Sequence, residues 1–393
     1  MIKRQIENEL KEVMAGYPIA VVTGPRQSGK TTLTRDLFSD RPYVNFENPL
    51  TRQQFDADPI GFLNRFPDGA VFDEAQHLPD LFSFLQERVD NDQRMGMYVL
   101  TGSQHFGLME QVSQSLAGRA GLLELLPFSL RELQQGNAQP DSLNELLFCG
   151  GYPAVYDRKL RPERWYADYT TTYIQRDVRS LRQIHDLDRF MLFLKMCAGH
   201  AGEMVNTNKW GAACGVDNKT IKSWLSVLRA AYIIDLVQPY HSNFNKRIVK
   251  TPKLYFLDTG LACHLLGIEK SAQLTTHPQR GALFENWVFS ELAKAFSNTG
   301  RPRQIYFWRT HAGHEVDFII EVNGERVAVE VKSGEMVRPE FIKSLLKWND
   351  LSEVPVQNLL VYGGTESFEM KGVHAVPWRD ISTALSPFFH KGE

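Results

Sequence analysis

The sequence is short of long hydrophobic runs and of cysteines, and these absences exclude several classes of protein. No uninterrupted apolar run approaches the roughly 18 residues that a membrane-spanning helix needs, so we expect no transmembrane segment and no membrane partner. The cysteines lie far apart and form no C-x-x-C pair, which argues against a disulfide framework or a zinc site. They are expected to be buried thiols in a reducing compartment, at Cys149, Cys197, Cys214 and Cys263.

The sequence also has almost no net charge, and its beginning does not look like a leader. A formal net charge of −2 offers no global attraction to nucleic acid, so any such binding must use local basic patches. The first residues lack an apolar signal core and include acidic side chains, which argues against a signal or transit peptide. We therefore expect a cytoplasmic protein. With 393 residues and 43% hydrophobic content, the chain can form two or three soluble domains.

A glycine-rich motif near the beginning of the chain is its most informative feature. The pattern Gly24-x4-Gly29-Lys30-Thr31 lies between an apolar run and an amphipathic stretch, which is the strand–loop–helix context of a phosphate-binding loop. Glycines let consecutive N–H groups point at phosphate oxygens, and the following helix adds its positive dipole end. Lys30 would contact the β- and γ-phosphates of ATP, and Thr31 would offer its hydroxyl to Mg²⁺. The residues predicted to bind nucleotide here are Gly24, Pro25, Arg26, Gln27, Ser28, Gly29, Lys30, Thr31 and Thr32.

Two further strands are expected to bring polar side chains to the same crevice. A short apolar strand ends in Asp73 and Glu74. In a nucleoside triphosphatase this Asp holds Mg²⁺ through its water shell, and this Glu polarises the attacking water. A third apolar strand is followed by Ser103 and Gln104, which we place beside the γ-phosphate because the ends of parallel strands share one crevice. The alternative for these two residues is a polar turn after a core strand.

The hydrophobic periodicity changes along the chain and predicts an α/β protein in four parts. Residues 1–135 alternate strands with helices, as in a parallel nucleotide-binding domain. A polar segment at 134–142 breaks this pattern, and residues 136–200 are expected to form a helical linker or lid. Residues 201–260 have the layout of a winged helix, and residues 261–393 return to mixed α/β character.

The predicted winged helix consists of two helices and a basic hairpin. A short helix ends at Gly215, and a second helix from about Asn218 to Ala231 buries a stripe of i, i+3, i+4, i+7 apolar residues. Two strands then flank a basic loop at 241–250. The second helix could enter a major groove while the hairpin contacts the phosphate backbone; the alternative is a helical lid that packs on the ATPase and touches no DNA. The residues predicted to bind DNA are Lys219, Lys222, Lys246, Arg247 and Lys250.

A β-hairpin is expected in the last quarter of the chain. Apolar strands at 318–322 and 326–332 flank Asn323-Gly324, which is a strong signal for a two-residue hairpin turn. The valines at 327, 329 and 331 indicate that the second strand is central in its sheet rather than a solvated face.

Charged residues around this hairpin form a recognisable pattern. Glu330 and Lys332 share one face of the second strand, the pairing brings Asp317 near them, and an upstream amphipathic helix carries Glu285. This spacing resembles that of the PD-(D/E)xK nuclease fold. The resemblance implies that Asp317 and Glu330 bind Mg²⁺ and that Lys332 orients or activates water for attack on a phosphodiester.

The whole chain resembles a widespread family of bacterial and archaeal AAA-type ATPases. Members of that family carry a C-terminal region classed as a domain of unknown function with a restriction-endonuclease-like core. The resemblance covers nearly the full length and implies an oligomeric, ring-capable ATPase, without settling the substrate. It rests on Gly24–Thr32, Phe72–Gln76, Leu100–Gln104, Gly118-Arg119, Leu126–Ser129, Gly150–Pro153, Tyr173–Val178, Tyr255–Leu261, Gly281–Glu285 and the hairpin from Glu315 to Lys332.

A ring ATPase completes each active site with an arginine from the neighbouring subunit, which stabilises charge on the transferring phosphoryl group. Arg119 is our first candidate for this arginine finger, and Arg176 is the second. For each of them the alternative is a surface salt bridge.

Three functions are compatible with this sequence. The first is a homo-oligomeric ring motor that binds ATP, Mg²⁺ and DNA, for which branched or forked DNA would be a suitable substrate. The second is an ATP-dependent, Mg²⁺-dependent DNA nuclease. The third is an ATP-switched signalling or scaffold protein whose winged helix and nuclease-like fold bind protein instead of DNA.

Overall fold

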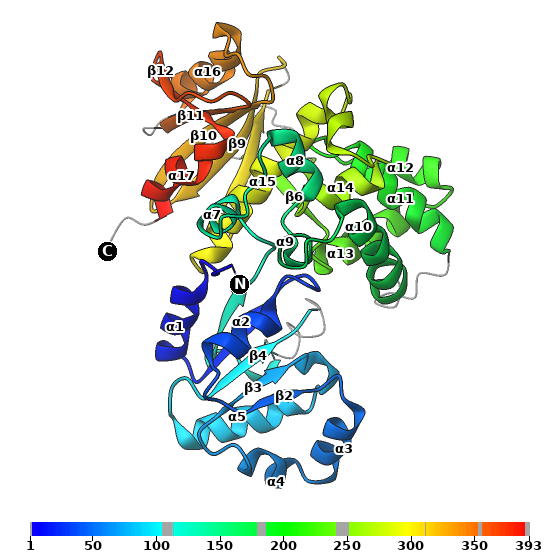
Figure 1. Ribbon diagram of the computed structural model, residues 1–393, viewed down its shortest axis with the longest axis vertical. Coiled ribbons are helices and arrows are strands. Elements are labelled where there is room, and N and C mark those ends of the chain that lie inside the picture. The colour runs from blue at the N-terminus through cyan, green and yellow to red at the C-terminus, as the bar shows by residue number, and fades with distance from the viewer. Residues whose placement is uncertain are drawn as a thin grey trace.

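The structure is a computed structural model that describes residues 2–103, 112, 114–178, 186–240, 251–310, 312–352 and 356–389, with the backbone alone described at 175–178. Figure 1 shows a sheet with its helices at one end of the molecule, a second sheet at the other end, and a group of helices beside the second sheet. The N-terminus lies at the junction between these parts (Figure 1).

The first sheet is parallel and has the strand order β2-β3-β4-β1-β5. Alternate residues of each buried strand face opposite layers of helix: Ala20 and Val22 pack against α1 and α2, whereas Ile19 and Val21 pack in the cluster of α3, α4 and α5. This confirms the parallel α/β fold predicted for the start of the chain. The elements are α1 (Glu7–Gly16), β1 (Ile19–Thr23), α2 (Lys30–Leu37), β2 (Tyr43–Asn45), α3 (Pro49–Ala57), α4 (Pro59–Asn64), β3 (Ala70–Asp73), η1 (Ala75–His77), α5 (Leu81–Asp92), β4 (Tyr98–Thr101) and β5 (Ala120–Glu124).

A group of helices follows, and it contains the two helices expected in the middle of the chain. The first of them, α12, ends at Gly215, which takes the left-handed conformation (φ 66°) that favours glycine. The second, α13, begins after Asp217, whose carboxylate caps it, and buries Ile221 and Leu228 on its apolar face. The elements are α7 (Leu130–Gln135), α8 (Leu143–Cys149), α9 (Pro153–Asp157), α10 (Pro162–Tyr169), the π-helix η2 (Thr170–Val178), α11 (Leu187–Gly199), α12 (Thr207–Cys214), α13 (Asn218–Ala230), α14 (Thr259–Leu265) and η3 (Ser271–Thr275).

The second sheet is mixed and has the order β12-β13-β11-β10-β9-β8-β6-β7. Its β9–β10 hairpin turns at Asn323 and Gly324, which both have positive φ (53° and 77°), as a two-residue turn requires. Strand β10 lies between β9 and β11, so the prediction of a central strand is confirmed. The elements are β6 (Ile234–Pro239), β7 (Lys253–Phe256), α15 (Arg280–Asn298), β8 (Ile305–Arg309), β9 (Glu315–Val322), β10 (Glu325–Lys332), η4 (Pro339–Ile342), α16 (Lys343–Leu351), β11 (Val356–Tyr362), β12 (Phe368–Met370), β13 (Val373–Pro377), η5 (Trp378–Asp380) and α17 (Ile381–Phe389).

The helical part and the second sheet share one hydrophobic core. A single cluster of buried residues runs from the middle helices into the sheet and as far as α17. Strand β6 pairs with β7 and also, in parallel, with β8, so the hairpin expected to be a wing is the edge of the larger sheet. Neither the core nor the sheet is interrupted at the boundary predicted at 260. Among the described residues, no helix combines the length and the apolar character needed to cross a bilayer.

Candidate functional site

The glycine-rich loop leaves β1 with a backbone conformation that depends on its glycines. Gly24 has φ 142°, and a Cβ atom there would lie 2.2 Å from the carbonyl oxygen of Leu125. Gly29, just before α2, has φ 97°, and Gln27 also lies in the left-handed region (φ 63°). The loop therefore curls back over the end of the strand. The hydroxyl of Ser28 is fully buried in this loop and has no hydrogen-bond partner among the described residues, so it is an unsatisfied donor.

Lys30 closes this loop from the first turn of α2. Its ammonium group donates hydrogen bonds to the carbonyl oxygens of Gly24 (3.0 Å) and Pro25 (2.8 Å), and the side chain is buried. Burial lowers the pKa of Lys30 to about 8, although the carboxylates of Glu74 and Asp73 act in the opposite direction. The loop therefore holds a positive charge on Lys30 although burial of the ammonium group disfavours its charged form.

Asp73 is the centre of a hydrogen-bond network at the end of β3. Its carboxylate accepts a bond from the Thr31 hydroxyl (2.9 Å), from the Thr101 hydroxyl and from the phenol of Tyr43. Burial, followed by the bond to Asp73, raises the pKa of Tyr43, so this phenol stays a donor. The sequence analysis paired Thr31 with Asp73 but missed Tyr43 and Thr101. Thr101 ends an apolar strand and was visible as such, whereas nothing in the local sequence marks Tyr43.

Glu74 follows Asp73 in a left-handed conformation (φ 55°), which is uncommon for a residue with a side chain. Its carboxylate accepts hydrogen bonds from the Ser103 hydroxyl (3.2 Å) and from the amide of Gln76, and its N–H donates to the Thr101 hydroxyl (3.3 Å). The structure thus brings Ser103 to Glu74, as expected from the parallel strands. Gln104 lies outside the described residues.

The pKa of Lys30 leads to a prediction about the pH dependence of nucleotide binding. Binding of a triphosphate places negative charge against the ammonium group and raises its pKa above the value of about 8 in the free protein. The contribution of this charge to affinity is therefore complete below pH 8 and is lost above it, by up to tenfold per pH unit. Titration of MgATP between pH 7 and 9.5 should show constant affinity and then a decline, and Lys30→Met should remove the decline. Wild-type affinity that stays constant up to pH 9.5 would contradict the prediction.

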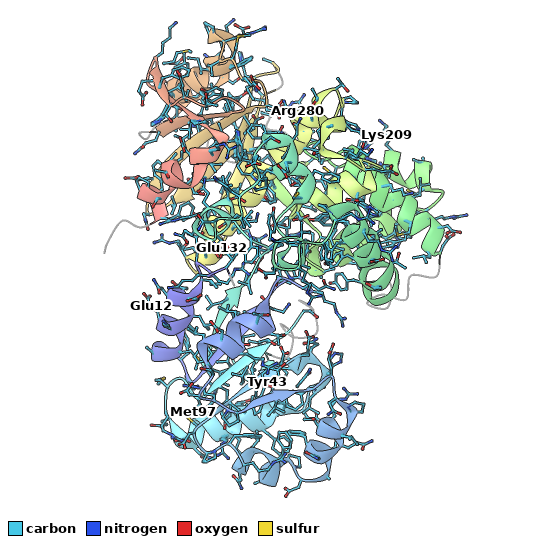
Figure 2. The ribbon with its side chains drawn as sticks, viewed as in Figure 1. Glu12, Tyr43, Met97, Glu132, Lys209 and Arg280 are labelled. Atoms are coloured by element: carbon cyan, nitrogen blue, oxygen red, sulfur yellow. The ribbon has the colours of Figure 1, made fainter. Side chains whose placement is uncertain are left out.

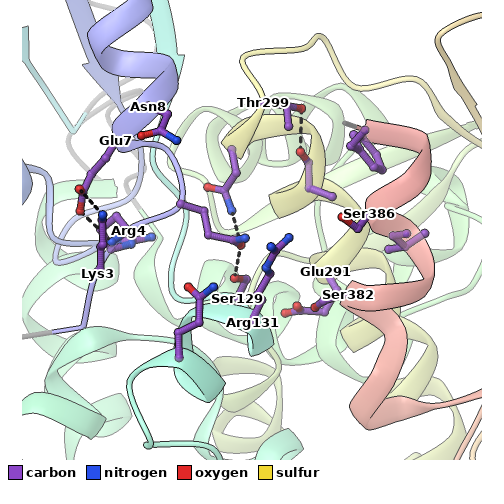
Figure 3. Close-up of a pocket in the computed structure, with 16 residues that line it drawn as sticks. Lys3, Arg4, Glu7, Asn8, Ser129, Arg131, Glu291, Thr299, Ser382 and Ser386 are labelled. Atoms are coloured by element: carbon purple, nitrogen blue, oxygen red, sulfur yellow. Dashed lines mark hydrogen bonds and ion pairs between the residues drawn. The ribbon is translucent and has the colours of Figure 1, made fainter. Parts of the chain in front are cut away.

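Residues far away in the sequence hold the loop from the other side. The guanidinium of Arg4 donates to the carbonyl oxygens of Ser28 (2.7 Å) and Leu126 (2.6 Å) and pairs with Glu132 (3.0 Å). Arg4 also lines a cavity of about 490 Å³, to which side chains from the N-terminal segment, α7, α15 and α17 contribute (Figure 3). The sequence analysis missed Arg4, because a single arginine before α1 carries no motif.

The helical part of the chain also contacts the loop directly. The phenol of Tyr232, which follows α13, donates to the hydroxyl of Thr23 at the end of β1 (2.9 Å). The guanidinium of Arg26 lies over the ring of Tyr173 in η2, 5.8 Å from its centroid. Pro153, the first residue of α9, lies beside Gly29. The loop is therefore in direct contact with the helices that follow it in the sequence.

Arg119 lies at the amino ends of the parallel strands, opposite the end from which the nucleotide loop leaves β1. It precedes β5, and its carbonyl oxygen accepts a bond from Ile19 at the start of β1, whereas the loop leaves the end of β1. Its guanidinium forms two bonds with Asp90 of α5, at 2.5 and 2.8 Å. Arg119 is thus remote from the loop of its own chain and forms the surface salt bridge that was the alternative, and its role as an arginine finger stays a prediction. The side chain of Arg176 lies outside the described residues.

The predicted acidic site is assembled at the β9–β10 hairpin. Asp317 accepts a bond from the Val331 N–H (2.8 Å), and Glu330 accepts one from the ammonium of Lys332 (2.5 Å). The second carboxylate oxygen of Glu330 is buried and has no hydrogen-bond partner. Burial, then the charges of Glu330 and Glu285, raises the pKa of Asp317 well above its usual range. These surroundings therefore disfavour a second negative charge at Asp317 beside Glu330.

Two residues of β7 belong to the same site and were missed. The ammonium of Lys253 pairs with Glu285 of α15 (3.1 Å) and Glu315 of β9 (2.5 Å), and the phenol of Tyr255 donates to Glu285 (2.5 Å). Burial lowers the pKa of Lys253, but Tyr255 and the surrounding carboxylates outweigh it and raise the pKa well above its usual value. The acidic site is therefore not formed by the predicted last part of the chain, residues 261–393, alone.

The basic residues predicted to bind DNA are only partly described. Lys219 and Lys222 are exposed on α13, and neither ammonium group forms a hydrogen bond or ion pair within the described part of the chain. Lys209 of the preceding helix is also exposed, and it lies on the helical part of the molecule, away from Tyr43 of the nucleotide site (Figure 2). The hairpin residues Lys246, Arg247 and Lys250 lie outside the described residues.

Comparisons with known proteins match three parts of the chain to families. Residues 16–134 match the family model described as an AAA domain. Residues 140–272 match a domain of unknown function (DUF8612), and residues 280–381 match another domain of unknown function (DUF4143).

Similar proteins were found both by sequence and by structure. The uncharacterized proteins Rv2008c of Mycobacterium tuberculosis and Mb2031c of Mycobacterium bovis are each 30% identical over 390 residues, which is 98% of this chain and 85% of each relative. The Walker-type ATPase paby2304 of Pyrococcus abyssi is 17% identical, with a TM-score of 0.46 over 67% of this chain and 96% of that chain. The Holliday junction branch migration motor RuvB of Thermotoga maritima is 18% identical, with a TM-score of 0.32 over 58% of this chain and 88% of that chain.

Proposed function

The chain belongs to a family of AAA-type ATPases that carry a C-terminal domain of unknown function, and we propose that it is a ring-forming motor that acts on DNA. ATP binding and hydrolysis follow from the family. The ring is our inference from the family resemblance, and the DNA is our inference from exposed lysines of this chain.

The geometry of the loop supports a phosphoryl-transfer mechanism. The ammonium of Lys30 would exchange its two loop carbonyls for phosphate oxygens of ATP, and the unsatisfied Ser28 hydroxyl would become a donor to the same phosphates. The Thr31 hydroxyl and the Asp73 carboxylate, 2.9 Å apart, fit a magnesium ion and would hold it directly and through its water shell. Mg²⁺ supplies charge neutralisation between the phosphates when it is bound. Glu74 would orient and polarise the attacking water.

One observation carries the DNA proposal. Lys219 and Lys222 are exposed, lack ion-pair partners among the described residues and lie one helical turn apart at the start of α13. This helix follows a short helix and a tight turn at Gly215, and the β6–β7 hairpin follows it. Two unpaired cations on the second helix of such a unit suit a pair of DNA phosphates.

Removal of these two charges tests the proposal. In mobility-shift assays with ATP present, the wild type should bind at least one of single-stranded, duplex, forked or four-way DNA. Lys219→Ala together with Lys222→Ala should weaken duplex binding and reduce the slope of log affinity against log salt by roughly 0.9 for each lost phosphate contact. A control that removes exposed lysines elsewhere, Lys11→Ala with Lys343→Ala, should leave that slope unchanged.

The outcome of this test also distinguishes the third candidate function. Equal affinity and slope in the α13 variant and in the control would remove α13 from the DNA interface. No binding to any DNA, together with an ATPase rate that DNA does not change, would favour a protein-binding role for the helices.

A DNA nuclease is the second candidate, and the acidic site favours it. Asp317 and the unpaired oxygen of Glu330 offer carboxylate ligands of the kind that Mg²⁺ prefers, and Lys332 lies beside them. A bound magnesium ion would supply a water nucleophile and neutralise a phosphodiester. Lys332 would orient that water, and β9 and β10 would fix the distance between the two carboxylates.

Cleavage assays decide whether this site is catalytic. With Mg²⁺ or Mn²⁺ present, the wild type should cleave some member of the DNA panel. Asp317→Ala should abolish cleavage and leave ATP hydrolysis at the wild-type rate, because the loop and the hairpin share no residue. Asp350→Ala, which removes an exposed carboxylate from α16, is the matched control. Cleavage that persists in Asp317→Ala would exclude this site as its source.

A further inference from the structure

The carboxylates of the acidic site form two groups that differ in their hydrogen-bond and ion-pair partners, and we call these groups its two halves. On one side, the carboxylates of Asp317 and Glu330 lie on paired strands, and one oxygen of Glu330 has no partner. On the other side, the carboxylates of Glu285 and Glu315 have a common partner, the ammonium of Lys253. Glu315 and Asp317 are two residues apart on β9 and so share one face of the strand, which places the two halves next to each other.

Lys253 is fixed in its half of the site. Its side chain is 4% exposed, and its ammonium lies 3.1 Å from Glu285 and 2.5 Å from Glu315. Tyr255, two residues further along β7, donates to the same oxygen of Glu285. Separating the partners of a buried ion pair is costly, so we expect this cation to keep its position when a metal ion binds to Asp317 and Glu330.

We propose that the ammonium of Lys253 takes the position that a second metal ion would have, so that the acidic site binds a single divalent ion through Asp317 and Glu330. Two-metal sites hold their ions about 3.5–4 Å apart between carboxylates. Here a lysine of the strand next to the helical part provides the second positive charge. The inference rests on the metal site of the second candidate function, and it adds that Glu285 is a partner of Lys253 rather than a metal ligand.

Charge around the site agrees with one ion rather than two. The four carboxylates of the two halves face the ammonium groups of Lys253 and Lys332, and the guanidinium of Arg309 reaches Glu315 from the rim (3.2 Å). With the four carboxylates ionised and these three cations in place, the formal charge is −1, so one divalent ion would leave +1, whereas two ions would leave +3 in a buried place.

Counting bound Mn²⁺ tests the inference without any activity assay. The full chain carrying Asp73→Asn, which weakens the metal site at the nucleotide loop, should bind one Mn²⁺ without nucleotide, and Asp317→Asn should abolish this binding. Adding Lys253→Met should raise the count to two, and Glu285→Gln should return it to one. The control Lys253→Arg keeps the positive charge and should keep the count at one.

Each other result has its own meaning. A count that stays at one in folded Lys253→Met, or that is already two with Lys253 in place, overturns the role of Lys253 and leaves the metal site standing. A count of zero overturns the metal site and the nuclease proposal with it. If Lys253→Met does not fold, anomalous diffraction of Mn²⁺ in the parent protein decides: density beside Asp317 and Glu330 supports the inference, and density between Glu285 and Glu315 overturns it.

Discussion

Replacing Glu74 with Gln is expected to lower the turnover number for ATP by about 10²- to 10⁴-fold while MgATP still binds. Glutamine keeps the size of the side chain and can accept the hydrogen bond of Ser103, so the geometry after β3 is preserved. An amide cannot polarise water as a carboxylate does. Glu74 also keeps a left-handed backbone (φ 55°), and such a residue is often held in place at a functional site.

Phosphate-release kinetics and equilibrium titration of MgATP measure the two quantities separately. Glu87→Gln makes the same chemical change at an exposed position of α5 and should have the wild-type turnover number. Lys30→Ala should instead abolish hydrolysis, because it removes the cation that binds the β- and γ-phosphates. Hydrolysis at the wild-type rate in Glu74→Gln would show that our assignment of the active site is wrong.

Replacing Arg119 with Ala is expected to lower turnover by about 10³-fold or more and to leave nucleotide affinity nearly intact, if Arg119 is the arginine finger of a ring. The position of Arg119 restricts the active site in which it could act. Arg119 lies at the start of β5 and binds Asp90, whereas the nucleotide loop follows the end of β1. It can stabilise a transferring phosphoryl group only in the site of an adjacent chain, which must draw it away from Asp90.

Mixed rings separate a finger from a structural arginine. Arg119→Ala has an intact loop, and Lys30→Ala has an intact Arg119, so an equal mixture contains interfaces with both. Random assembly makes about a quarter of the head-to-tail interfaces competent, and activity should return to about that share. No recovery in a mixture shown to exchange subunits would argue against Arg119 as the finger. Asp90→Ala removes the partner of Arg119 and keeps its guanidinium, so its turnover number should be of the same order of magnitude as that of the wild type.

Local spacing in the sequence is enough to specify several parts of the protein. Glycines at positions 24 and 29 specify a loop that curls, because few other residues adopt positive φ at low cost. Asn323-Gly324 likewise specifies a two-residue turn, and strand alternation then sets which side chains share a face. The parallel first sheet, the central β10 and the grouping of Asp317 with Glu330 follow from these rules.

The distant residues that complete each site are selected by packing across the whole chain. Tyr43 reaches Asp73, Arg4 reaches the loop at Ser28, and Lys253 reaches Glu315, each across a stretch of sequence that carries no motif. Such contacts depend on strand order and on the packing of helices over the sheet. The sequence periods of two residues for strands and 3.6 residues for helices do not predict these contacts, because each period describes a single element.

The edge of the second sheet shows the same division. Alternation and the basic loop predicted a hairpin from β6 and β7, and the structure has it, but it also pairs β6 with β8. That pairing joins the helical part to the second sheet in one core and carries Lys253 into the acidic site. A strand's own sequence sets its faces, whereas its partners at the open edge are chosen by burial across the whole chain.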